Sequence, residues 1–487
     1  MIDLLVDGGT LITMDGQRRI IQNGAVAVDK GKIMEVGGTK EIRKKYKASC
    51  SIDAENCAVM PGLIDTHGHA GHSMVKTIAE NYKDWGRLIE DIYLRGVTEE
   101  FWYTDGLLAS LARLKFGTTT GVSFLGGGRG AYRTDDPKYA ELYADAVKEV
   151  GIRGIIGLGP VGRAPYAPRK YVMYEDGEKT SRIVDFDDML KTTEKIVNKY
   201  NDLGKLVTAR VTVSTISPNI EDLSDKNANL RVLSDEDVAT IKEQLKEIRR
   251  LADETGRGIL AHAHGGIIKS ALKLGLLGPD VVLAHCSGLS EEEIKIFKET
   301  GTSVSHCPRA RSIMRRRCPV VELIDAGVTV ALGSDGAAPD RNFDMFLDMR
   351  TAQTLQRHHF HDSGYMPPGK VLEMATIDAA KALGLEREIG SLEVGKRADI
   401  ILVNLKKAHI TPIFMVPHRI VYEAYGHDVD TVIIDGEIVM ENRTVRNVEE
   451  DRVLEQAQRV AEEVISSNDL DKYLVPAKGF WGSSKYL

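Results

Sequence analysis

Histidines at a repeated spacing are the residues of this sequence best suited to chemistry. His67 and His69 stand two residues apart, and His262 and His264 repeat that arrangement later in the chain. In an extended segment, residues two apart project from the same face, about 6.6 Å from each other. Two imidazoles of such a pair can therefore reach a single metal ion.

Two further candidates, His285 and Asp335, each follow an apolar run. Imidazole nitrogens together with one carboxylate suit a borderline metal such as Zn²⁺, and a catalytic zinc site keeps one position open for water. A divalent ion lowers the pKa of its water from 15.7 to about 7, so that hydroxide can attack a substrate at neutral pH. This residue set predicts metal-assisted hydrolysis.

Strand-like and helix-like segments alternate between these residues. Amphipathic helical patterns occupy, among others, residues 139–150, 235–254 and 291–299. This alternation predicts an α/β protein, a (β/α)8 TIM barrel with its active site at the C-terminal ends of the strands. The histidines and the aspartate fall at those ends. The predicted strands cover residues 59–64, 118–124, 151–158, 206–213, 258–261, 281–284, 302–305 and 328–332.

Both ends of the chain have a different texture, with short strands separated by turn residues such as Gly8-Gly9. A domain inserted between two halves of another leaves this signature. We therefore predict a small β-sandwich from residues 1–58 and 386–447, a metal-dependent barrel over 59–385, and a C-terminal helix and tail over 448–487.

Composition excludes several classes of partner. The 487 residues include 64 Lys+Arg and 71 Asp+Glu, a net charge of −7 that gives no field for attracting nucleic acid or an anionic membrane. The N-terminus lacks the pattern of a secretory signal, and the longest uncharged stretch, 116–128, is too short to span a bilayer. Five scattered cysteines without a CxxC motif favour reduced thiols. We expect a cytoplasmic protein that acts on a small molecule.

Several motifs together resemble the amidohydrolase superfamily, and most closely its chlorohydrolase and aminohydrolase branch. That branch includes triazine hydrolases, guanine deaminases and S-adenosylhomocysteine deaminases. The resemblance covers nearly the whole chain, and homodimers or homotetramers are usual in the branch. The motifs are MPGLIDTHGH at 60–69, AHC at 284–286, SHCP at 305–308, LGSDG at 332–336 and IGSLEVGKRAD at 389–399.

The resemblance implies a ligand set for one divalent metal ion, with zinc expected and iron as the alternative. His67 and His69 are the first two ligands. Asp335 binds the metal and accepts a proton from its water. The fifth barrel strand supplies the third histidine, for which we expect His264, with His262 in reserve as a residue beside the substrate.

Other positions are implied to face the substrate. His285 would lie beside the metal and polarise the substrate or its leaving group, and His306 resembles a position that lines the pocket after the seventh strand. Arg309 follows that strand closely enough to clamp an anionic group, although a solvated basic helix face is the favoured alternative.

One departure from the branch concerns proton transfer. Its members commonly carry a glutamate three residues after the ligand of the fifth strand, where it passes a proton to a ring nitrogen. Counted from His264, that position is Ile267, a residue we expect near the substrate. Counted from His262, it is Gly265, so neither numbering supplies the carboxylate and standard guanine- or cytosine-type deamination is in doubt.

The resulting expectation is a metal-dependent hydrolase of a non-peptide C–N bond. An aminohydrolase or deaminase acting on a small N-heterocyclic or amidine-like substrate fits best. A cyclic-amide hydrolase or hydrolytic dehalogenase of the same superfamily is less affected by the missing glutamate. A metal-binding member without turnover is the third possibility, against which the complete His/His/His/Asp set weighs.

Overall fold

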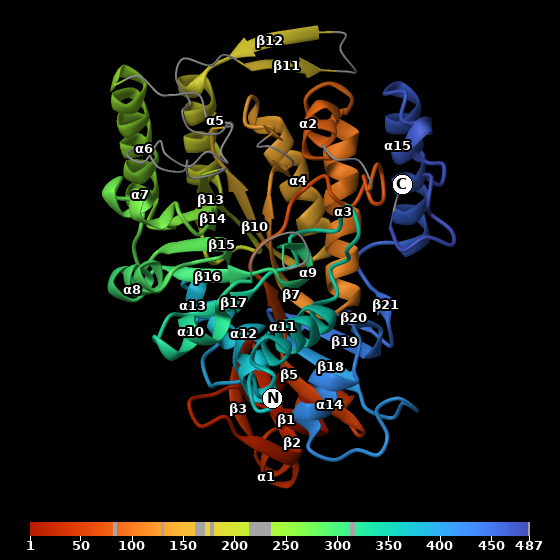
Figure 1. Cartoon of the computed structure of the whole chain (residues 1–487). Coiled ribbons are helices and arrows are strands. Elements are labelled where there is room, and N and C mark those ends of the chain that lie inside the picture. The colour runs from red at the N-terminus through yellow and green to blue at the C-terminus, as the bar shows by residue number, and fades with distance from the viewer. Residues whose placement is uncertain are drawn as a thin grey trace.

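Eight parallel strands form the centre of the molecule (Figure 1). The computed structural model describes residues 1–80, 85–127, 131–160, 171–175, 180–213, 235–311 and 317–485. The eight strands pair in the order β17-β16-β15-β14-β13-β10-β7-β6. The two outer strands are joined by hydrogen bonds from Thr66 N to Leu332 O (3.1 Å) and from Asp335 N to His67 O (2.9 Å), which close the sheet. The predicted (β/α)8 barrel is confirmed. Its strands are β6 (Leu63–Asp65), β7 (Thr118–Phe124), β10 (Arg153–Leu158), β13 (Val207–Val213), β14 (Ile259–His264), β15 (Val281–Ser287), β16 (Ser303–His306) and β17 (Val330–Leu332).

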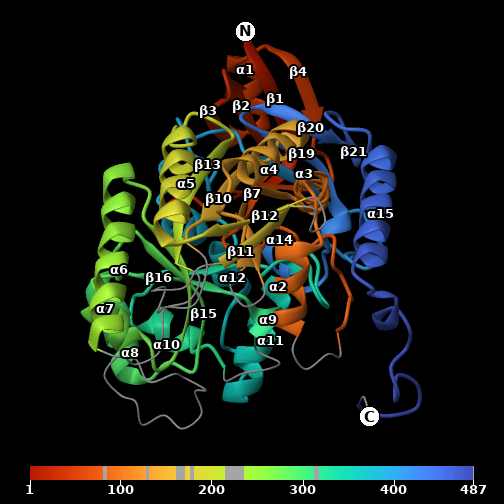
Figure 2. The same ribbon diagram turned by 90° about the horizontal axis from the view of Figure 1, so that it is seen from above.

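Helices surround this barrel, as Figures 1 and 2 show. Local signals define their ends: Ser290 and Glu293 form a capping box that starts α8, and Gly301 in the left-handed region ends it. The predicted helices correspond to α4, α6 and α8. The helices are α2 (Trp85–Arg95), α3 (Glu99–Lys115), α4 (Pro137–Val150), α5 (Phe186–Lys199), α6 (Asp235–Thr255), α7 (Ile268–Lys273), α8 (Glu291–Thr300), α9 (Pro308–Arg311), α10 (Val320–Asp325), α11 (Met345–Phe360), α12 (Pro368–Met374) and α13 (Ile377–Ala382).

Alternation along the barrel strands decides which side chains reach the centre. Ile64, Val122 and Val282 come from different strands yet belong to one buried cluster, which only the barrel interior allows. Their neighbours in sequence point the other way, as Leu283 does when it joins the larger cluster that includes the surrounding helices. Which residues of each strand point into the barrel therefore determines which side chains at the strand ends can contact one another.

A second sheet combines the two ends of the chain, seen as red and blue strands together in Figure 1. Strand β18 pairs antiparallel with β5 and so joins the C-terminal strands to the N-terminal ones. Its N-terminal members are β1 (Ile2–Ile12), β2 (Ile20–Asp29), β3 (Lys32–Gly38), β4 (Ala48–Asp53) and β5 (Cys57–Pro61), with α1 (Thr39–Lys45). The C-terminal members are β18 (Ile400–Asn404), β19 (Val429–Ile434), β20 (Glu437–Glu441) and β21 (Thr444–Val445), with α14 (Val416–Tyr422) and the 3₁₀ turn η1 (Gly426–Asp428).

Two details differ from the expected strands. The run 59–64 is divided between the two sheets at Gly62, where a Cβ would lie 2.1 Å from Thr119 Oγ1. The expected turn at Gly8-Gly9 is instead an irregularity within the continuous strand β1, with a shift in pairing to β2 and a φ of +91° at Gly8. A glycine in the left-handed region is typical of such a bulge, so the turn residue serves here inside a strand.

The predicted C-terminal helix is α15 (Glu450–Ser467), which packs along α3 (Figure 2). Lys115 Nζ donates to Glu450 at 2.7 Å. Val453 and Val460, on the inner face of α15, are buried. Among the described helices, none is both long and apolar enough to cross a membrane. The remaining short elements are the hairpins β8 (Gly126–Gly127) with β9 (Ala131–Tyr132) and β11 (Tyr171–Glu175) with β12 (Thr180–Val184), and the turn η2 (Asp471–Tyr473).

Candidate active site

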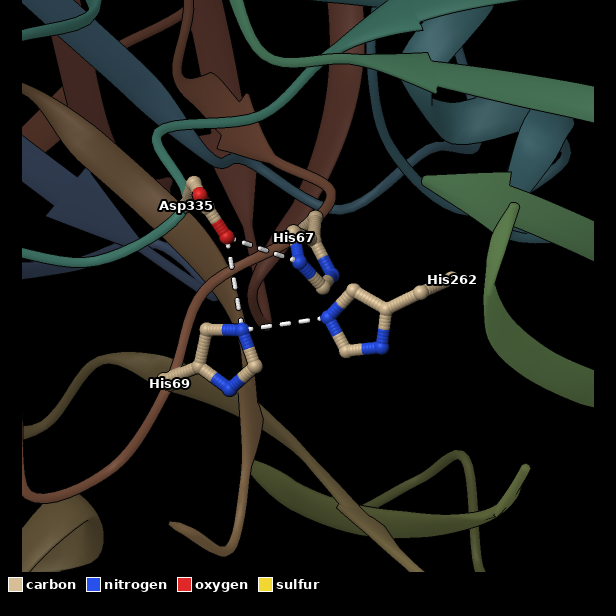
Figure 3. A group of neighbouring side chains, drawn as sticks. All are labelled: His67, His69, His262 and Asp335. Carbon is tan, nitrogen blue, oxygen red and sulfur yellow. Dashed lines mark hydrogen bonds and ion pairs between the residues drawn. The ribbon is translucent and has the colours of Figure 1, made fainter. Parts of the chain in front are cut away.

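Three histidines and one aspartate meet at the C-terminal ends of the barrel strands (Figure 3). Asp335 Oδ1 lies 3.1 Å from His67 Nε2 and 3.3 Å from His69 Nε2, and His262 Nε2 lies 3.2 Å from His69 Nε2. Ligands bonded at about 2.1 Å to a tetrahedral zinc ion lie about 3.4 Å apart. These three distances are close to that value, and all four ligand atoms lie within 4.8 Å of one another, which suits one such ion.

The orientation of the rings also favours a cation. Gly126 O accepts a hydrogen bond from His69 Nδ1 at 2.7 Å, which orients the ring with Nε2 toward Asp335 and His262. Burial lowers the pKa of His67 and keeps that ring neutral. Asp335 Oδ1 lies 3.3 Å from His69 Nε2, so a single ion between them would contact both. The donor set thus fits a divalent metal ion.

His285 reaches this cluster because its backbone is strained. The alternation along β15 would turn it toward the helices, on the same side as Leu283. A φ of +72° at His285 turns the ring inward instead, so that its Nε2 lies 3.8 Å from Asp335 Oδ1. Asp335 itself has a φ of +61°. Two non-glycine residues in the left-handed region at one site are typical of functional strain.

The fifth strand contributes a different histidine from the one expected. His262 joins the ligand cluster, whereas His264 donates from Nδ1 to the carbonyl of Gly265 at 2.8 Å. Both rings start on the same side of β14, but His264 lies one pleat farther along, beyond an irregular pairing with β15. The choice of His264 as ligand does not fit this geometry, and the reserve residue His262 takes its place.

Two residues expected to face the substrate lie elsewhere. His306 follows Val304 on the helix side of β16, where burial and the charge of Arg317 lower the pKa of its ring to about 3. Arg309 donates from Nε and Nη2 to the carboxylate of Asp348 at 2.9 and 2.7 Å, and from Nη1 to Asn342 at 2.8 Å. A guanidinium bound in this way ties α9 to α11 rather than clamping a substrate.

The turn after β14 has no room for the glutamate of related enzymes. With His262 as ligand the position is Gly265, where a Cβ would lie 2.0 Å from Gly288 O. Ile267, the other candidate position, is fully buried in the main apolar core. The carboxylate that contacts this turn, Glu293, accepts from Gly266 N at 2.7 Å and caps α8. At the position of the proton-transfer carboxylate, the chain therefore has Gly265, whose backbone packs against Gly288.

Sequence reasoning missed a buried network that aligns two of the site's loops. Asp65 accepts hydrogen bonds from Ser334 N (2.8 Å) and Ser334 Oγ (2.7 Å), and it forms an ion pair with Arg113 of α3 at 2.9 Å. Asp65 stands two residues before His67, and Ser334 precedes Asp335. The position of Asp65 next to the histidine motif could have indicated its role, but nothing in the sequence around Arg113 indicates that it pairs with Asp65.

Two more residues beside Asp335 were not singled out as site residues. Arg341 Nη2 lies 3.6 Å from Asp335 Oδ2, and its buried Nε has no hydrogen-bond partner in the described structure. The ring of His72 is 3% exposed and its centroid lies 4.8 Å from that of His69, with both ring nitrogens likewise without a described partner. These polar groups line the edge of the site next to the aspartate.

Comparisons with known proteins agree with this geometry. The model of the amidohydrolase family matches residues 58–439. The chain is 31% identical to a 5'-deoxyadenosine deaminase of Methanosarcina mazei, covering 96% of this chain and 99% of that protein. It is 33% identical to a 5-methylthioadenosine/S-adenosylhomocysteine deaminase of Desulforudis audaxviator, covering 91% of this chain and 95% of that protein.

Solved structures share the fold at lower identity. An adenosine deaminase from Xanthomonas campestris with bound zinc superimposes with a TM-score of 0.80 at 22% identity, over 96% of this chain and 99% of that one. An atrazine chlorohydrolase variant from Arthrobacter aurescens gives 0.78 at 20% identity, over 94% of this chain and 100% of that one. The predicted enzyme class, a hydrolase of C–N bonds other than peptide bonds, is confirmed. The chain belongs to the amidohydrolase family.

Proposed function

We propose that the protein is a deaminase that hydrolyses the 6-amino group of a 5'-modified adenosine and releases ammonia. The observation that carries this proposal is the buried cluster of His67, His69, His262 and Asp335 with His285 directed at it. The substrate class follows the relatives, which are named as deaminases of 5'-deoxyadenosine, 5-methylthioadenosine and S-adenosylhomocysteine.

The four ligand residues would hold one divalent ion, zinc in preference to iron, because three imidazoles and one carboxylate suit a borderline metal. When bound, such an ion lowers the pKa of water toward about 7 and polarises the reacting carbon–nitrogen group. The second ring nitrogen of His69 is held by Gly126 O, which fixes the orientation of that ligand before the substrate arrives.

Asp335 accepts the proton of the attacking water. Its Oδ1 faces His67, His69 and His285, while Oδ2 faces Arg341. The imidazoles and Arg341 hold the pKa of this buried carboxylate well below its usual value although burial acts in the opposite direction. The carboxylate is thus ionised and ready to accept a proton at neutral pH.

His285 is positioned to act on the leaving group. Its Nε2 lies 3.8 Å from Asp335 Oδ1, so a proton taken from water by Asp335 can be passed to His285 and on to the departing amine. Positioned proton transfer of this kind contributes about 10²–10⁴-fold to a rate. Deamination delivers both protons of the water to the substrate, one to the ring nitrogen and one to the departing amine. With Gly265 in place of a glutamate, we assign both transfers to Asp335 and His285.

The packing at Gly265 favours a second candidate within the same superfamily. Hydrolysis of a cyclic amide or of a C–Cl bond needs no protonation of a ring nitrogen by a carboxylate at that position. The same metal cluster and the same Asp335 would serve that reaction. A member that binds metal without turnover is disfavoured, since binding alone does not require strain at both His285 and Asp335.

The experiment is a substrate panel assayed with zinc-loaded protein. It contains 5'-deoxyadenosine, 5-methylthioadenosine and S-adenosylhomocysteine, with a cyclic amide and a chlorotriazine as the alternative arm. We expect ammonia release and the ultraviolet change from adenine to hypoxanthine with at least one nucleoside. Turnover confined to the cyclic amide or chlorotriazine would replace the proposal with the second candidate, and metal binding without any turnover would refute both.

We further propose that the protein works in the cytoplasm as a homodimer or homotetramer. Trp481 and Phe480 near the C-terminus are 81% and 46% exposed, and large exposed aromatic groups are enriched at subunit interfaces. Sedimentation of the wild type is expected to give a dimer or tetramer, and Trp481→Ser is expected to weaken it. A wild type that sediments as a monomer at micromolar concentration contradicts this proposal.

A further inference from the structure

A second group of potential metal ligands lies outside the barrel. His409 follows β18, and His427 and Asp428 belong to the 3₁₀ turn η1 that precedes β19. Their ligand atoms all lie within 4.8 Å of one another. The two histidine side chains are 38% and 62% exposed, whereas that of Asp428 is fully buried.

The carboxylate of Asp428 is only half satisfied. Oδ2 accepts hydrogen bonds from His409 Nε2 (2.8 Å) and from Tyr425 N (2.9 Å). Oδ1 is buried without a hydrogen-bond partner in the described structure, and His427 Nε2 lies 3.5 Å away from it. A buried carboxylate oxygen left without a donor costs free energy, and an ion or a water is the usual explanation.

Two arginines that contact this turn, Arg443 and Arg350, do not donate to this oxygen. Arg443 Nη1 donates to the carbonyls of Val429 (2.7 Å) and Gly426 (3.3 Å), on either side of the turn. The Arg350 guanidinium lies over the Tyr425 ring, 4.6 Å from its centroid. Both cations are thus engaged elsewhere, which leaves Oδ1 of Asp428 facing the exposed imidazole of His427.

The distances suit a borderline divalent metal. Two ligands bonded at about 2.1 Å to a tetrahedral ion lie about 3.4 Å apart, close to the 3.5 Å between His427 Nε2 and Asp428 Oδ1. The exposed sides of the two histidines leave room for water in the remaining coordination positions. On binding, a neutral His409 ring moves its single proton from Nε2 to Nδ1 and offers the freed Nε2 lone pair to the metal.

We propose that His409, His427 and Asp428 form a second metal site, distinct from the barrel cluster, that takes Zn²⁺ or a similar transition metal. It joins the segment after β18 to the turn η1. Gly426 in that turn donates to Asp344 Oδ2 at 3.1 Å, which links the site to the start of α11. The site is structural: it stabilises the packing of the C-terminal strands against the barrel and takes no part in catalysis.

Equilibrium dialysis of the holoenzyme against Zn²⁺ at micromolar concentration tests this proposal. The wild type is expected to bind two zinc ions per chain. His427→Ala and His409→Ala are each expected to bind the second ion more than about tenfold more weakly, since even loss of a residue supporting a ligand costs 10–100-fold. His359→Ala, which removes an exposed histidine of α11, is the matched control and is expected to bind two.

Thermal unfolding provides a readout that is independent of activity. Zinc in excess of one equivalent should raise the Tm of the wild type and of His359→Ala, but not that of His427→Ala, while all three keep the same turnover. Wild-type protein that binds only one zinc ion per chain overturns the proposal. So does a second ion that His427→Ala and His409→Ala both retain at wild-type affinity, because that ion would lie elsewhere.

Discussion

At the scale of single residues, strained backbone angles and a hydrogen bond to a ring nitrogen orient the side chains of the site. His285 and Asp335 have φ angles of +72° and +61°, which non-glycine residues rarely adopt and which cost of order 1–3 kcal/mol each. In return, both side chains face the three imidazoles rather than the helix layer. The ring of His69 is oriented by a hydrogen bond from its Nδ1 to Gly126 O. The barrel therefore presents preorganised ligands to a metal ion.

Asp335→Asn is expected to abolish turnover while leaving the fold intact. The amide keeps the volume of the carboxylate but cannot accept the proton of the attacking water, so the rate should fall by at least about 10²–10⁴-fold. Steady-state ammonia release measures the loss, and near-ultraviolet circular dichroism checks the fold. Asp325→Asn, on the exposed face of α10, is the control and should retain the wild-type rate. Near-normal turnover by Asp335→Asn would refute the assigned role.

His262→Ala and His264→Ala form a matched pair that tests which histidine of β14 is the ligand. His262 lies in the cluster, whereas His264 donates to Gly265 O. We expect His262→Ala to lose tightly bound barrel zinc and His264→Ala to keep it, as measured by metal analysis after dialysis against a weak chelator. The reverse result would show that the expectation from the sequence was right and the geometry misleading.

At the scale of elements, buried hydrogen bonds and an ion pair hold the strand ends in register. Asp65 joins the end of β6 to Ser334 after β17 and to Arg113 of α3. The Arg113 and Asp65 side chains are 3% and 0% exposed, so the loss of either would leave a buried charge unpaired. These contacts help to place His67 and Asp335 opposite each other.

Gly265→Ala should destabilise the protein by about 1–3 kcal/mol, because the new Cβ would lie 2.0 Å from Gly288 O and the two strand ends would have to separate. Gly369→Ala is the matched control: it is exposed in α12, nothing lies within 4 Å of the new Cβ, and a small gain in stability is expected. Chemical denaturation measures both. Equal stability of the two variants would mean that the turn after β14 yields easily and that a glutamate could be accommodated there.

Acid stability depends on a buried ion pair between β9 and α4. Burial alone would raise the pKa of Asp135, but hydrogen bonds and charges of Arg133 and Arg182 outweigh it and lower the pKa. The folded-state pKa thus lies below that of the unfolded chain, about 3.9. This stabilisation is complete above about pH 4 and is lost as pH falls through the folded-state pKa.

Asp135→Asn is expected to be less stable than the wild type by about 3 kcal/mol at pH 7, because Arg133 is left buried without a charged partner. The difference should shrink as pH falls below about 4, where the carboxyl of the unfolded wild-type chain becomes protonated, and should vanish only once the folded-state carboxyl is protonated as well. Denaturation curves between pH 3 and pH 7 measure it. A difference that stays constant over this range would show that the charge of Asp135 does not contribute.

At the scale of the whole molecule, most of the architecture was predictable from the sequence. Each of the eight predicted runs overlaps one barrel strand, because buried parallel strands are continuous apolar segments separated by helical periodicity. The division of 59–64 at Gly62 was not predictable, since it depends on contact with Thr119, which is remote in sequence. The sheet shared by both chain ends followed from their common texture of short strands.

The residues of the site were predictable only in part. The HxH motifs and the strand-end aspartate signalled their roles by type and position, and the structure brings His67, His69, His285 and Asp335 together. The choice between His262 and His264 could not be settled, because both face the same way and only the depth along the strand separates them. Arg309 and His306 lie away from the cluster for a related reason: the contact of Arg309 with Asp348 of α11 and the burial of His306 depend on tertiary packing that no local pattern encodes.

The central claim is that metal held by His67, His69, His262 and Asp335 makes this protein a deaminase. The most direct measurement is ammonia release from 5'-deoxyadenosine by protein depleted of metal with a chelator and then titrated with Zn²⁺. We expect no release by the depleted protein and full recovery as the barrel site fills, with Asp335→Asn inactive at every zinc concentration. Ammonia release that persists without metal, or that is absent for every nucleoside of the panel after zinc is restored, would contradict it.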